Sequence, residues 1–68
     1  MLHVVIWNGK RDEIHYVEAE NMATRQDADA AIRAAKAVDI ATGSALMADM
    51  TYRIVDDAAL AAYYGEAA

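Results

Sequence analysis

The sequence predicts an α+β fold, in which a small antiparallel sheet, made of an N-terminal β-hairpin and a returning strand, is packed by one main α-helix and followed by a short C-terminal helix. Three observations support this prediction. Residues 2–7 are rich in β-branched and aromatic side chains and lead into an Asn-Gly turn signal. Residues 24–38 place apolar side chains three and four positions apart, which is typical of one helix face. Residues 50–55 alternate as a half-buried strand does.

The hairpin can be closed in two ways. A two-residue turn at Asn8-Gly9 would mix apolar and charged side chains across the strands, whereas a five-residue loop over residues 8–12 keeps cross-strand neighbours compatible. We therefore expect the longer loop. Its register pairs Ile6 with Ile14, Val4 with Tyr16 and Val5 with His15.

This register gives the sheet two unlike faces. The face expected beneath the main helix carries Leu2, Val4, Ile6, Ile14 and Tyr16. The mixed face carries His3, Val5, Trp7, Glu13, His15 and Val17. Because the mixed face is neither a clean core nor a clean solvent surface, we expect either the end of the chain or another subunit to cover part of it.

The main helix follows a link over residues 18–23. Thr24 is its expected N-cap, with Asp27 positioned to reach back to the cap amide. Its apolar stripe consists of Ala28, Ala31, Ile32, Ala35 and Val38. Ile40 is out of phase with the stripe, which favours an end near Val38; the alternative is an exit at Thr42 with Gly43 as a left-handed cap.

The remaining segments are less clearly patterned. Residues 44–49 cannot be assigned to strand or helix by period, and a fourth strand would form if residues 45–48 paired. Asp56-Asp57 is expected to cap the short helix, which would run through Tyr64 and close at Gly65, with the last residues frayed. Since no repeat, low-complexity tract or proline divides the chain, residues 1–68 are expected to form a single domain.

Composition excludes several classes of function. The net charge of −5 opposes binding to a phosphate backbone, so nucleic acid is not expected as a partner. The absence of cysteine removes disulfides, thiolate zinc sites and thiol catalysis, and it fits a reducing compartment, here taken as the cytoplasm. Residues 2–7 are too short an apolar run for a signal peptide or a membrane span, so no membrane partner is expected.

Candidate chemical sites are weak. No nucleophile is placed with a base, so no catalytic residue is assigned, the protein is expected not to be an enzyme, and no cofactor is expected. His3, Glu13 and His15 share the mixed face and suggest a metal or small-molecule site, but three ligands without a supporting shell do not justify assigning a metal site. A basic spot formed by Lys10, Arg11 and Arg25 beside Trp7 would be the minimum for stacking on single strands, and the total charge opposes it.

The favoured function is therefore a small protein-interaction or oligomerisation module that forms a homodimer, binds another protein, or does both. One main helix and one short helix cannot easily cover both faces of a sheet, and aromatic side chains are enriched at interfaces. The predicted interface residues are Val5, Trp7, Val17, Tyr63 and Tyr64. The alternative is a small-molecule or metal-binding protein that uses His3, Glu13 and His15.

Overall fold

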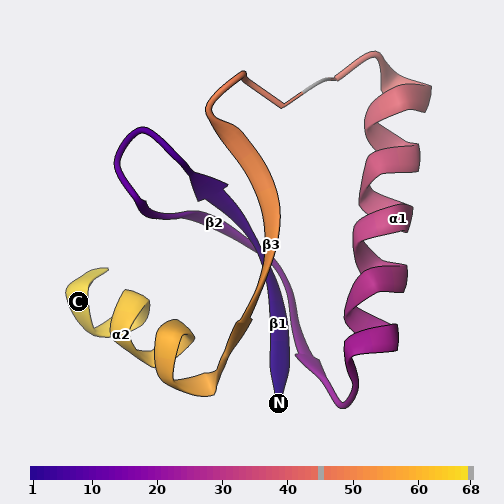
Figure 1. The fold of residues 1–68 in the computed structure, drawn as a ribbon. Coiled ribbons are helices and arrows are strands. Elements are labelled where there is room, and N and C mark those ends of the chain that lie inside the picture. Colours follow the sequence, from indigo (N-terminus) through magenta and orange to yellow (C-terminus); the bar gives the residue numbers. More distant parts are fainter. Residues whose placement is uncertain (45, 68) are drawn as a thin grey trace.

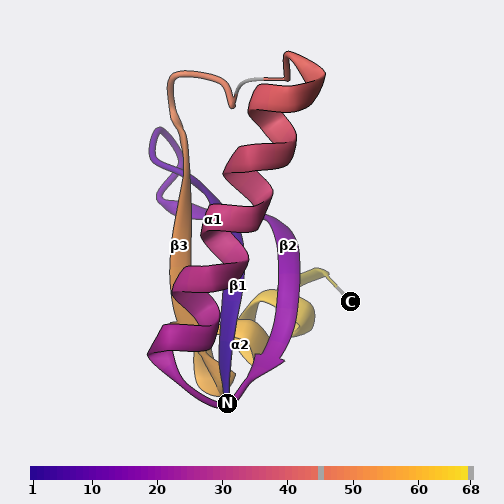
Figure 2. The same cartoon turned by 90° about the vertical axis from the view of Figure 1, so that its right-hand side faces the viewer.

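The computed structural model describes residues 1–44 and 46–67, and its elements follow the order ββαβα. They are strand β1 (Leu2–Asn8), strand β2 (Glu13–Met22), helix α1 (Arg25–Thr42), strand β3 (Met50–Asp56) and helix α2 (Asp57–Ala67). The sheet is antiparallel with the order β2-β1-β3, so β1 is central. Helix α1 lies on one face and α2 on the other (Figure 1), and the perpendicular view shows the same arrangement (Figure 2). The predicted α+β class is confirmed.

The core is built around β1. Val4 and Val5 are both 0% exposed. Because neighbouring side chains on a strand point to opposite faces, this pair shows that both faces of β1 are covered. β-Branched residues suit such a position, since their stiff side chains pack well on a pleated surface.

The register between β1 and β2 differs from the predicted one. Asn8 pairs with Glu13, so the loop contains four residues, 9–12, and the register shifts at three points along the hairpin. The observed pairs include Trp7 with Ile14, Ile6 with Tyr16, Val5 with Val17 and Val4 with Ala19. The predicted pairs of Ile6 with Ile14, Val4 with Tyr16 and Val5 with His15 were therefore wrong. Each bulge places an extra residue in one strand and moves the pairing by one position.

The bulges also move side chains between faces. Ile14, expected beneath the main helix, lies opposite Trp7 on the α2 side and is 9% exposed. Tyr16 remains on the α1 side, opposite Ile6, yet it is 57% exposed. Helix α1 therefore covers less of its face than the sequence pattern implied.

Helix α1 begins where the sequence predicts. The hydroxyl of Thr24 accepts a hydrogen bond from the amide of Asp27 at 3.1 Å, as an N-cap does. The preceding link is shorter than expected, because β2 continues to Met22 and includes most of residues 18–23.

The end of α1 was placed too early by the favoured prediction. The helix passes Val38 and ends at Thr42, with Gly43 as a left-handed cap at φ 71°, which was the alternative. Ile40 is 83% exposed. An apolar residue out of phase with the stripe thus marks an exposed position of a continuing helix, rather than its end.

The segment between α1 and β3 is a connection. Leu46 and Met47 have no regular structure, and Ala48 and Asp49 form a turn. The possible fourth strand over residues 45–48 includes Ala45, which lies outside the described residues, and the other three positions do not form a strand.

Helix α2 is capped as expected, since Asp56 Oδ1 accepts from the amide of Ala59 at 2.9 Å. The helix does not close at Gly65, as the sequence suggested, but continues through it to Ala67. The fraying predicted for residues 66–68 is not found at Glu66 and Ala67, which belong to the helix, and Ala68 lies outside the described residues.

Candidate functional site

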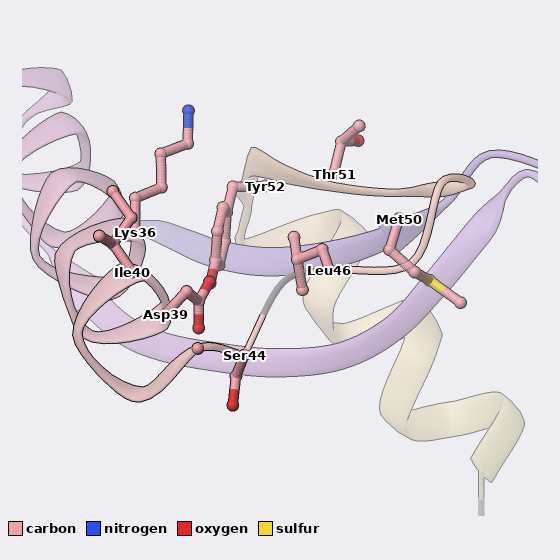
Figure 3. Close-up of a pocket in the computed structure, with 9 residues that line it drawn as sticks. Lys36, Asp39, Ile40, Ser44, Leu46, Met50, Thr51 and Tyr52 are labelled. Atoms are coloured by element: carbon pink, nitrogen blue, oxygen red, sulfur yellow. The ribbon is translucent and has the colours of Figure 1, made fainter.

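An open groove of about 580 Å³ lies between the C-terminal half of α1 and strand β3. We call it the α1–β3 groove (Figure 3). Its lining residues are Lys36, Asp39, Ile40, Gly43, Ser44, Leu46, Met50, Thr51 and Tyr52. Most of the lining surface is apolar, so the groove offers mainly hydrophobic contact area.

The course of α1 explains the groove. Near its start the helix packs closely on the sheet, where the small side chain of Ala28 is 0% exposed. The helix then crosses the sheet obliquely, so that its C-terminal half diverges from β3 (Figure 2), while the β1–β2 hairpin curves away from α1 (Figure 1). Bulges increase the local twist of a strand pair, which accounts for the curvature of the hairpin.

Apolar side chains project into solvent beside the groove. Ile40 is 83% exposed and Met47 is 75% exposed. Ile40, Leu46 and Met50 line the groove itself, and Met47 follows Leu46 in the connection to β3. These four residues, Ile40, Leu46, Met47 and Met50, are called the α1–β3 surface below.

A hydrogen bond crosses the groove and joins α1 to β3. The Tyr52 hydroxyl donates to Asp39 Oδ2 at 2.6 Å. This bond to a carboxylate, reinforced by burial, raises the pKa of Tyr52 to about 12. Sequence reasoning missed Asp39, although a signal was present: it continues the three-and-four spacing of Ala28, Ile32 and Ala35, and a carboxylate on an inward-facing stripe needs a polar partner.

His3 is almost completely buried, at 2% exposed, and both of its ring nitrogens are occupied. Nδ1 accepts from the backbone amide of Asn21 at 3.0 Å, so the proton is on Nε2, which donates to Asp57 Oδ1 at 2.7 Å. Asn21 has a left-handed backbone, at φ 66°, within the irregular part of β2. The pKa of Asp57 is lowered mainly by a hydrogen bond from the Met1 amino group and, to a smaller extent, by the hydrogen bond from His3. His3 thus ties β1 to both β2 and α2.

The three residues of the alternative hypothesis, a metal or small-molecule site, are not brought together. His3 lies near the start of β1, whereas Glu13 pairs with Asn8 at the other end, five strand positions or roughly 16 Å away. Glu13 and His15 are both exposed. Within residues 1–44 and 46–67, no three acidic or histidine side chains are grouped so that they could hold a metal ion.

The predicted interface face is partly covered by the chain's own C-terminal helix. Val5 is fully buried, and Trp7, Val17 and Tyr63 are half-buried. Tyr64 remains 47% exposed, with its ring 5.6 Å from that of Tyr63. Trp7 and Tyr63 line a second open groove between α2 and the hairpin, about 550 Å³ in volume. The sequence predicted that either the end of the chain or another subunit covers part of this face, and the end of the chain does so.

Trp7 is also packed from β3, because the Arg53 guanidinium lies 4.1 Å from the centre of its ring. The basic spot proposed beside it is not assembled. Arg11 on the hairpin loop lies 3.6 Å from Glu13, while Arg25 lies 3.6 Å from Asp29 at the start of α1, at the opposite end of the sheet (Figure 1).

No family model, curated protein or solved structure matches this chain. Among the residues that the structure describes, no helix is long and apolar enough to cross a membrane. The surfaces described above are therefore the basis for a functional proposal.

Proposed function

We propose that this chain is a small protein-interaction module, without catalytic activity, that forms a homodimer through the α1–β3 surface. The observation that carries the proposal is the cluster of exposed apolar side chains beside an open groove, with Ile40 83% and Met47 75% exposed. Scattered apolar residues are normal on monomers, whereas exposed apolar side chains gathered around an open groove are typical of an interaction surface. The proposed compartment is the cytoplasm, on the absence of cysteine.

The dimensions of the chain support burial against another molecule. Its accessible surface is 4658 Å², compared with about 4200 Å² for a monomeric protein of 7.4 kDa. Its radius of gyration is 12.0 Å, compared with about 11 Å for a compact domain of this length. The excess surface is about 450 Å², more than half of the roughly 800 Å² that each partner buries in a standard interface.

A second copy is the occupant that fits best, because a two-fold interface needs one patch that is complementary to itself. The α1–β3 surface combines a groove with the protruding side chain of Ile40 at its edge. The face around Val5, predicted from the sequence, is the weaker candidate because α2 already lies over it.

Sedimentation equilibrium tests the proposal with two matched variants. Ile40→Glu places a charge on the α1–β3 surface, and Ala37→Glu places the same charge on an exposed position of the same helix. The wild type and Ala37→Glu are expected to have twice the chain mass at micromolar concentration, whereas Ile40→Glu is expected to be monomeric with unchanged helical circular dichroism. A monomeric wild type at high concentration, or an Ile40→Glu variant that dimerises like the wild type, would contradict the proposal.

A further inference from the structure

The two edges of the sheet are not equivalent. Strand β2 forms one edge and carries features that discourage pairing with another strand: its register against β1 shifts three times, and Asn21 has a left-handed backbone. Glu18 and Glu20 add charge along it. Bulges and charged side chains are the usual means by which proteins protect a sheet edge.

Strand β3 forms the other edge and lacks the bulges of β2; of its charged side chains, Arg53 lies over Trp7 and Asp56 caps α2. Its seven residues pair with β1 without a register shift, and it contains neither proline nor glycine. At the start of β3 the amide of Met50 already has a partner, because it donates to the Met47 carbonyl in the preceding turn. Within residues 1–44 and 46–67, no other strand pairs with the outer side of β3. A regular edge with unpaired backbone groups is a template for another strand.

We propose that a second copy of this chain adds to β3 in the antiparallel direction, so that two three-stranded sheets become one six-stranded sheet. This inference rests on the proposed homodimer and supplies its geometry. Because the α1–β3 groove borders β3, pairing at this edge also places the groove of each copy at the dimer interface.

The side chains of β3 select a register centred on Tyr52. In this register Tyr52 lies opposite the partner's Tyr52, Met50 opposite the partner's Ile54, and Thr51 opposite the partner's Arg53, which gives compatible neighbours on both faces. A register centred on Arg53 would set two guanidinium groups directly opposite each other, and one centred on Ile54 would set Tyr52 opposite the carboxylate of the partner's Asp56.

The oblique course of α1 fits this arrangement. A two-fold axis perpendicular to the sheet keeps both copies of α1 on the same face and reverses their direction. In the view of Figure 2, α1 begins in front of β3 and ends displaced toward the β2 side of the sheet, where Asp39 reaches Tyr52 across the groove. The start of one α1 therefore lies beside the open groove at the end of the other, and the apolar α1–β3 surface becomes covered.

Disulfide trapping tests the register, because the natural chain has no cysteine and each variant then carries a single thiol. Residues directly opposite in an antiparallel pair lie within disulfide range, whereas diagonal neighbours, with Cβ atoms roughly 7–8 Å apart, do not. A mixture of Thr51→Cys and Arg53→Cys chains is expected to form the mixed disulfide at least about fivefold faster than either variant forms its own. The matched control is a mixture of Glu18→Cys and Glu20→Cys on the β2 edge, which should show no such preference.

Hydrogen exchange tests the same geometry on the wild-type chain, without any substitution. Amides on the outer side of β3 are expected to exchange more slowly as the chain is concentrated, while those on the outer side of β2 do not change. If sedimentation shows a dimer but the mixed disulfide and the β3 protection are both absent, this geometry is wrong and the homodimer proposal stands. If the wild type is a monomer at high concentration, both fail.

Discussion

Replacing His3 with alanine should be among the most destabilising single changes in this chain. The side chain is 2% exposed and joins Asn21 on β2 to Asp57 on α2. His3→Ala leaves the part-buried Asn21 amide without its acceptor, which costs about 1–3 kcal/mol, and it also removes the packing of the ring. We expect a total loss of about 2–4 kcal/mol, out of the roughly 3–10 kcal/mol that a domain of 68 residues possesses.

Urea unfolding followed by Trp7 fluorescence measures this loss. With a slope of about 1 kcal/mol per molar, the midpoint of His3→Ala should fall by roughly 2 M or more. His15→Ala is the matched control, because His15 is exposed, and its midpoint should stay within about 0.5 M of the wild type. Equal midpoints for the two variants would refute the argument that the hydrogen bonds of His3 stabilise the fold.

Three further outcomes are expected. Tyr52→Phe removes the hydrogen bond to Asp39 and should lower the free energy of unfolding by about 1–3 kcal/mol. In an absorbance titration, the variant should lack the tyrosine that ionises near pH 12. The loss of stability relative to the wild type should stay constant up to about pH 10 and shrink above it. Asp57→Asn should destabilise the fold at neutral pH, and because the pKa of Asp57 is lowered, the difference in urea midpoint should shrink on acidification below about pH 4. Ile32→Ala should lower the free energy of unfolding by about 1–2 kcal/mol, since Ile32 is only half-buried; an unchanged melting curve would show that this side chain adds nothing to the core.

The sequence determined which elements form and where the two helices begin. Thr24, Gly43 and Asp56 act through contacts with residues that are three or four positions away, so their roles follow from the local sequence alone. The alternation of β3 was equally predictable, because a strand with only one buried face alternates apolar and polar side chains along its own sequence. The α+β class followed from these local signals.

The hairpin register could not be predicted in the same way. Compatible neighbours favoured an unbroken ladder, whereas the β1–β2 pairing has three irregularities and the β1–β3 pairing has none. Asn21 offered a partial signal, since asparagine tolerates the left-handed backbone found there. The reason for this backbone conformation became clear only from the structure, in which the Asn21 amide donates to the buried His3.

Only the tertiary structure decided which side chains are used inside the chain and which remain at the surface. The bond from His3 to Asp57 joins residues 54 positions apart, and no periodicity reports a contact of that separation. The α1–β3 groove depends on the angle at which α1 crosses the sheet, and such an angle comes from how whole elements pack on each other. Local patterns thus fix which elements form, because they arise within a few residues, while the exposed surface at Ile40 arises from how whole elements fit together.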